Sequence, residues 1–152
     1  MIKKKLMTKS GLIALKGKLA ELESQRPRLV KRVETARQMG DLRENSEYHA
    51  AREDLTLLDT QIDELREVLA NIKVVNKSNN SFKVGLESIV TVKSNQREVV
   101  YQLVGEHESD PFGGKISYTS PLGQALMGKK VGDRVVAKTP SGQVEYQIVA
   151  IK

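Results

Sequence analysis

Apolar residues in the first half of the chain recur with alternating spacings of three and four. The first stripe, which only Arg26 interrupts, consists of Leu12, Leu15, Leu19, Leu22, Leu29, Val33 and Ala36. The second stripe follows Gly40 without interruption and consists of Tyr48, Ala51, Leu55, Leu58, Ile62, Leu65, Leu69 and Ile72. Sustained spacing of this kind is typical of a coiled-coil seam. The two stripes therefore predict two long helices. Because few residues separate them, we expect these helices to fold back as an antiparallel hairpin.

Two further features of this half refine the predicted hairpin. Pro27 lies inside the first helix, where its missing N–H and its ring predict a bend and not an end.

Residues 1–40 contain eleven Lys or Arg and three Glu, whereas residues 41–72 contain three Arg and nine Asp or Glu. A basic arm beside an acidic arm favours their pairing. Because exposed ion pairs contribute little free energy, the charges mainly set specificity.

The period changes to two beyond residue 82. Strand candidates are 89–92, 99–104, 131–138 and 144–151, and the turn Pro140-Ser141-Gly142 joins the last two as a hairpin. Ser120-Pro121 begins a short helix that stops at Gly128. The polar run 76–81 is typical of a linker. We therefore expect an α+β protein with a coiled-coil hairpin at 1–75, a linker at 76–81 and a small antiparallel β domain with one short helix at 82–152.

Composition narrows the class of protein. The chain has no cysteine, which excludes disulfides and thiolate metal sites. No apolar run is long enough to cross a membrane, and the basic N-terminus lacks the apolar segment of a signal peptide, so we expect a soluble cytoplasmic protein with no membrane association. The net charge of +6 suits a polyanion or an acidic protein surface. No P-loop, nucleophilic triad or dinucleotide fingerprint occurs in the sequence.

Asp41 and Glu44, in the turn between the two stripes, allow two interpretations. In one, Gly40 ends the first helix in the left-handed conformation, Asp41 caps the second, and Glu44 completes a capping box. In the other, counting back along the seam from Tyr48 places both carboxylates on one face, where they can share a hard cation. Mg²⁺ requires octahedral oxygen coordination, so two carboxylates bind it weakly by themselves. They would then form half of a site that a partner completes.

Arg37 and Arg52 hold matching places on the two arms, each one residue after a seam alanine. Guanidinium groups beside a metal and phosphate centre suit contacts to a nucleic-acid backbone. The alternative is that both are ordinary solvated arginines of a helix surface.

Three segments of the sequence resemble the bacterial Gre transcript-cleavage factors. They are Arg26-Pro27, Gly40–Glu53 and Ser120–Asp133, and together the resemblance covers nearly the whole chain. The compact basic patch is similar to that of the GreA type more than to that of the GreB type.

This resemblance implies a function. The hairpin would enter the secondary channel of bacterial RNA polymerase, where Asp41 and Glu44 would help to hold Mg²⁺ jointly with the polymerase. Backtracked RNA would then be cleaved and elongation would resume. Arg37 and Arg52 would contact the nascent RNA 3′ end. The C-terminal domain would be FKBP-like and would dock on the polymerase through Thr119, Ser120 and Pro121. The chain would be a monomeric activator and not an enzyme, with no cofactor tightly bound in the free protein.

Three alternatives stay open. A Gre-like antagonist would occupy the channel without stimulating cleavage, although family antagonists differ at the tip. An FKBP-type peptidyl-prolyl isomerase would need an aromatic-lined pocket, which is hard to build with Phe82 and Phe112 and no Trp. A coiled-coil adaptor would use Asp41 and Glu44 only as helix caps.

Overall fold

The chain forms two compact units in a computed structural model, which describes residues 4–41, 44–77 and 82–152. One unit consists of Ile13–Asn71, and the other combines Met1–Leu12 with Ile72–Lys152. Most of the polar run 76–81, the predicted linker, lies outside the described residues.

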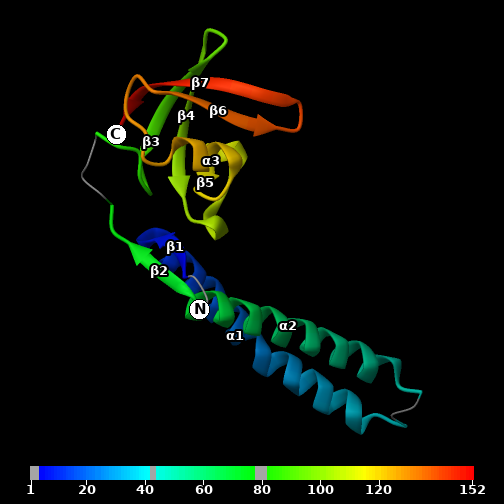
Figure 1. The fold of residues 1–152 in the computed structure, drawn as a ribbon. Coiled ribbons are helices and arrows are strands. Elements are labelled where there is room, and N and C mark those ends of the chain that lie inside the picture. Colours follow the sequence, from blue (N-terminus) through cyan, green and yellow to red (C-terminus); the bar gives the residue numbers. More distant parts are fainter. Residues whose placement is uncertain (1–3, 42–43, 78–81) are drawn as a thin grey trace. The chain divides into compact units, whose positions relative to one another are not determined.

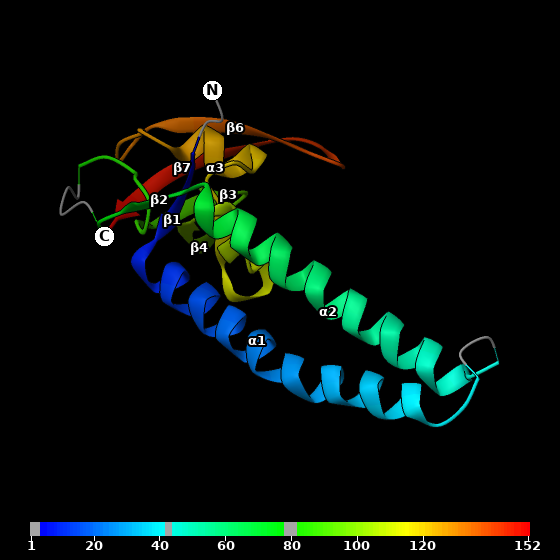
Figure 2. The ribbon, with the colours of Figure 1, turned by 90° about the horizontal axis from the view of Figure 1, so that it is seen from below.

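Helices α1 (Lys9–Gln38) and α2 (Ser46–Ala70) form the predicted hairpin. They run side by side in opposite directions (Figure 2). Helix α1 continues through Pro27, so the expectation that the proline does not end the helix is confirmed. The seam is the buried face of the pair: Ala36, Ala51, Leu58 and Ile62 are all less than 5% exposed, and its other helical members are half-buried.

Ion pairs also connect the two arms. Arg26, which interrupts the first apolar stripe, donates from Nε to Asp59 Oδ1 at 2.7 Å and from Nη2 to Asp59 Oδ2 at 3.3 Å. This hydrogen bond lowers the pKa of the Asp59 carboxyl below its ordinary value. The inter-arm pairs are Arg26–Asp59, Arg32–Glu47, Arg32–Asp54 and Arg66–Glu23. Three of these four join a base of the first arm to an acid of the second, as the charge pattern predicted.

The segments directly before α1 and after α2 in the sequence form a small parallel sheet, which the sequence did not predict. Strand β1 (Lys5–Thr8) pairs with β2 (Ile72–Val75), and Lys5 lies opposite Ile72. The second stripe therefore leaves the helix before its last predicted member, Ile72. The side chain of Thr8 starts α1, because its Oγ1 accepts the N–H of Gly11 at 3.0 Å.

The C-terminal sheet has the strand order β5-β4-β3-β7-β6 (Figure 1). Its strands are β3 (Ile89–Ser94), β4 (Arg97–Val104), β5 (Lys115–Ser117), β6 (Arg134–Thr139) and β7 (Gly142–Ile151). Three of the four pairings are antiparallel, including the predicted hairpin of β6 and β7. Strand β5 runs parallel to β4, so the prediction of a purely antiparallel domain is wrong at this edge. The α+β class is confirmed.

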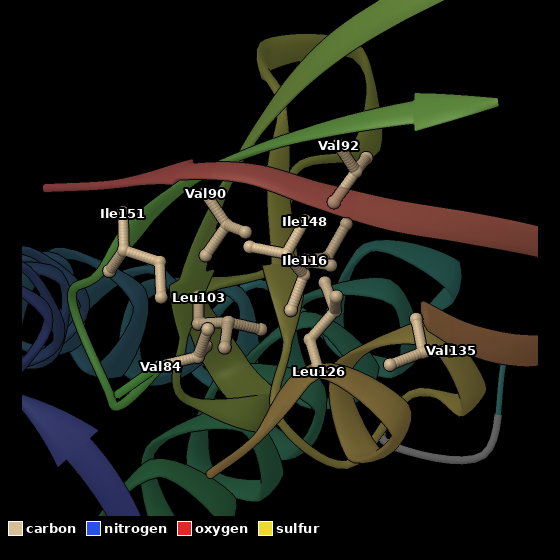
Figure 3. Packing of buried hydrophobic residues seen from close by; sticks show 9 residues of the cluster. All are labelled: Val84, Val90, Val92, Leu103, Ile116, Leu126, Val135, Ile148 and Ile151. Carbon is tan, nitrogen blue, oxygen red and sulfur yellow. The ribbon is translucent and has the colours of Figure 1, made fainter. Parts of the chain in front are cut away.

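An aliphatic core holds this domain together (Figure 3). Alternation along β3 places Val90 and Val92 in the core and leaves Thr91 half-buried between them. Phe82 and Phe112 are both on the surface. The buried cluster consists of Val84, Val90, Val92, Leu103, Ile116, Leu126, Val135, Ile148 and Ile151.

Short helical turns complete the C-terminal domain. They are η1 (Glu106–Glu108), η2 (Pro111–Gly113) and α3 (Pro121–Leu126). Helix α3 has Ser at its N-cap and Pro at its first turn, as predicted, and it ends two residues before Gly128, which adopts φ +77°. Within the described ranges, no helix is long and apolar enough to cross a membrane.

Candidate functional site at the hairpin tip

The tip loop is the segment 39–45 between α1 and α2; of these residues, Leu42 and Arg43 lie outside the described part of the chain. Gly40 does not adopt the left-handed conformation, so the prediction that it ends α1 in that way is wrong. The helix ends on a tighter turn, in which the N–H of Met39 donates to the carbonyl of Ala36 at 3.1 Å.

Asn45, and not Asp41, caps the second helix. Its Oδ1 accepts the N–H of Tyr48 at 3.0 Å, and its backbone is extended, as an N-cap requires. Its Nδ2 donates across the loop to the carbonyl of Ala36 at 2.7 Å. The capping interpretation of Asp41 and Glu44 is therefore wrong, because an asparagine nearer the helix holds the capping position.

Asp41 and Glu44 are both exposed and belong to the loop itself. The N–H of Glu44 donates to the carbonyl of Asp41 at 3.3 Å, so a backbone hydrogen bond links the two residues. Helix α2 begins at Ser46, so the prediction that both carboxylates continue the helical stripe is wrong too. Residues 4–41, 44–77 and 82–152 contain no group of three or more potential metal ligands. The two tip carboxylates can therefore supply only part of an octahedral Mg²⁺ shell.

Arg37 and Arg52 are exposed, and each follows a buried seam alanine, as expected. Arg37 lies in the last turn of α1. Arg52 borders a shallow hollow of about 480 Å³ on the surface of α2, together with His49 and Thr56. Both cations are available to an anionic ligand near the tip.

Arg32 braces the arms behind the tip loop. It donates to Glu47 Oε1 at 2.8 Å and to Asp54 Oδ2 at 2.5 Å. Its hydrogen bond is the main reason that the pKa of Glu47 is lowered from its ordinary value. Sequence reasoning missed this three-residue network. The opposite charges of the arms were visible, but the choice of partners depends on the register between the two helices.

The predicted docking residues, Thr119–Pro121, lie directly before α3 and at its first position. The Oγ of Ser120 accepts the N–H of Gly123 at 3.0 Å and donates to the carbonyl of Ser117 at 2.6 Å. Thr119 is held by Ser117, whose Oγ accepts its N–H at 3.0 Å. Pro121 is exposed at the first position of the helix. This loop therefore presents Thr119 and Pro121 on a backbone that local hydrogen bonds hold in place.

Comparison with known proteins adds independent information. A family model described as "Transcription elongation factor, GreA/GreB, C-term" matches residues 79–152, and one described as "Transcription elongation factor, N-terminal" matches residues 5–74. Transcription elongation factor GreA of Legionella pneumophila (strain Lens) is 42% identical over 151 residues, covering 96% of this chain and 94% of the relative. The GreA of a Nitratiruptor species is 37% identical over 154 residues, covering 99% of this chain and 94% of the relative.

Two solved structures also align with the chain. GreA factor homolog 1 (Gfh1) of Thermus thermophilus has 26% identity and a TM-score of 0.46, with 98% of this chain and 99% of that chain covered. The transcription elongation factor GreA/GreB from Nitrosomonas europaea has 22% identity and a TM-score of 0.44, with the same coverage.

The two family models together span nearly the whole chain, and they define its class: the chain belongs to the GreA/GreB family of transcription elongation factors. Within that family it is most similar to the GreA type, as the identities of about 40% to GreA proteins show. The resemblance inferred from the sequence motifs is confirmed.

Proposed function

We propose that this chain inserts its hairpin into the secondary channel of bacterial RNA polymerase and stimulates cleavage of backtracked RNA. The observation that carries the proposal is the exposure of Asp41 and Glu44 in one loop at the end of a long, braced pair of helices. At the helical rise per residue, arms of this length reach about 40 Å. The polymerase is the enzyme in this proposal, and the chain is its activator.

The tip supplies carboxylate oxygens and the polymerase supplies the rest of the metal site. Held by both, Mg²⁺ would activate the attacking water and stabilise the leaving oxygen of an in-line displacement. Asp41 and Glu44 act by arriving at a fixed place on a rigid arm and raising the occupancy of a weakly held ion. Because two carboxylates cannot complete octahedral coordination, no tightly bound metal is expected in the free protein.

Arg37 and Arg52 bind the displaced RNA in this proposal. Both are exposed near the tip, and guanidinium groups form paired hydrogen bonds with phosphate. Such contacts position the RNA backbone without reading its sequence.

The proposal is tested with a stalled, backtracked elongation complex. We expect the wild-type chain to release short 3′ RNA fragments. Asp41→Asn should reduce release to the rate of the polymerase by itself, because the amide loses the negative charge that attracts Mg²⁺. The concentration needed for half-maximal binding should not change. Glu53→Gln, which removes an exposed carboxylate from α2, is the matched control and should cleave normally.

The outcomes separate the candidate functions. Wild-type cleavage by Asp41→Asn would refute the metal-assisting role. Polymerase binding without fragment release by the wild-type chain would instead identify a channel-blocking antagonist.

Docking through the loop at Thr119–Pro121 predicts a different defect. Substituting Pro121 by Ala should raise the half-saturating concentration about tenfold, a change of about 1.4 kcal/mol, and leave the maximal cleavage rate unchanged. Pro140→Ala, at an exposed turn of the same domain, is the control. Unchanged affinity of Pro121→Ala would remove the docking assignment.

A further inference from the structure

A single side chain fastens both ends of the tip loop. Asn45 Oδ1 accepts the N–H of Tyr48 in the first turn of α2, at 3.0 Å, and Nδ2 donates to the carbonyl of Ala36 in the last turn of α1, at 2.7 Å. Helix ends carry backbone groups without partners inside the helix. Asn45 therefore satisfies one such donor on α2 and adds a second hydrogen bond to the Ala36 carbonyl of α1, which also accepts the N–H of Met39.

The bridge lies beside the buried face of the hairpin. Ala36 is 2% exposed and Ala51 is fully buried, so both alanines belong to that face. An asparagine side chain has only two rotatable bonds, so its hydrogen bond to the Ala36 carbonyl brings the start of α2 near the last turn of α1. Asn45 is also partly buried, and a hydrogen bond shielded from water is electrostatically stronger.

Another inter-arm link near the tip is of a different kind. Arg32 meets Glu47 and Asp54 through a long side chain, and all three side chains are at least 38% exposed. Exposed ion pairs of this kind contribute little free energy and are screened by salt. The Arg32 network therefore favours pairing of the arms, whereas Asn45 fixes where the loop starts and ends.

We propose that Asn45 is the positioning residue that holds Asp41 and Glu44 in the geometry that cleavage requires. Glu44 directly precedes Asn45, and its N–H is bonded to the carbonyl of Asp41, so a shift at Asn45 passes to both carboxylates. A displacement of about 1 Å in a catalytic group can cost on the order of a hundredfold in rate. This inference rests on the proposed function, because the role of Asn45 is defined by its effect on RNA cleavage.

Three variants separate the bridge from the helix cap. Asn45→Ser keeps a good N-cap but is too short to reach Ala36. Asn45→Asp also keeps the cap, and it places a carboxylate oxygen opposite the Ala36 carbonyl, where the two repel. The matched control is Asn71→Ser: Asn71 lies at the other end of α2, and its Nδ2 donates to the carbonyl of Glu67 at 3.1 Å. This control makes the same Asn-to-Ser change at an amide-to-carbonyl hydrogen bond far from the tip.

The first measurement uses the free protein and needs no polymerase. Backbone order parameters from ¹⁵N relaxation should fall at Asp41 and Glu44 in both Asn45 variants and stay unchanged in Asn71→Ser. The helix content measured by circular dichroism should equal that of the wild type in all three. Unchanged order parameters at Asp41 and Glu44 would refute the claim that Asn45 fixes the loop.

The second measurement uses the backtracked elongation complex. We expect Asn45→Ser and Asn45→Asp to lower the maximal cleavage rate on the order of tenfold with an unchanged half-saturating concentration, and Asn71→Ser to match the wild type. A wild-type maximal rate for Asn45→Ser, or a defect only in binding, would overturn the inference. If the wild-type chain releases no RNA, the proposed function fails, while the order parameters still decide whether Asn45 fixes the loop.

Discussion

Gly123 is buried in α3 at a point where a larger side chain does not fit. A methyl group on its Cα would overlap the carbonyl oxygen of Ser117 and crowd the backbone of Tyr118. Both obstacles are backbone atoms, so relief requires movement of the segment that carries Thr119 and Ser120. The absence of a side chain at Gly123 is therefore what lets α3 pack so closely on the segment that leads into it.

We predict that Gly123→Ala destabilises the C-terminal domain by about 1–3 kcal/mol, the usual cost of overpacking. Gly17→Ala is the matched control, because open space surrounds Gly17 inside α1. There alanine should stabilise the hairpin by about 0.5–1 kcal/mol. Urea unfolding followed by NMR signals from each unit measures both changes. A neutral Gly123→Ala would show that the segment moves freely.

At the tip, the sequence was a poor guide to the roles of single residues. Asp41, Asn45 and Ser46 are all good helix caps, and the rule for a capping box selected Asp41 with Glu44. The structure selects Asn45 because its amide also reaches Ala36, a contact between two helices that local patterns do not contain. Ser120 was predicted correctly because Pro121 follows it and leaves one place for the helix to start.

At the scale of elements, the seam between α1 and α2 depends on a few deeply buried positions. Leu58 is 4% exposed and Leu57, its neighbour on the same helix, is 60% exposed. We predict that Leu58→Ala destabilises the hairpin by about 2–4 kcal/mol, because it loses buried surface and leaves a cavity. Leu57→Ala should change stability by less than about 0.5 kcal/mol. Thermal unfolding followed by helical circular dichroism compares the two, and equal effects would contradict the assigned seam.

The helices and strands that the sequence predicted each show a strong hydrophobic period within their own residues. The stripes defined α1 and α2, and the alternation of Val90 and Val92 defined β3. Strands β1, β2 and β5 were missed, since they have only four, four and three residues. Segments this short show no measurable period, and each becomes a strand through a partner distant in sequence. The parallel direction of β5 likewise follows from the path of the chain through η1 and η2, and not from its composition.

At the scale of the whole chain, Glu108 connects segments about one hundred residues apart. Its Oε2 accepts the N–H groups of Thr8, at 3.0 Å, and of Gly105, at 2.9 Å, and its Oε1 accepts the hydroxyl of Thr8. One carboxylate thus joins the start of α1 to η1, inside the unit that combines the first residues with the C-terminal sheet.

We predict that Glu108→Ala lowers the stability of this unit by about 2–3 kcal/mol, because it leaves two partly buried N–H groups without acceptors. Hydrogen exchange at the amides of Thr8 and Gly105 should accelerate together. Glu106→Ala, on the same turn, removes only the exposed pair with Lys5 and should have less than half that effect. Unaltered exchange at Thr8 in Glu108→Ala would show that other contacts hold this junction.

The pairing of β1 with β2 has a consequence for the order of folding. Lys5 lies opposite Ile72 with the entire hairpin between them in sequence, whereas the tip loop joins neighbouring segments of chain. Closing a long loop costs more entropy than closing a short one, and contacts between distant residues form late. We therefore expect the hairpin to nucleate at the tip and to zip toward β1 and β2. During synthesis, β1 would therefore emerge from the ribosome before α1 and α2 and yet find its partner strand only after they have paired.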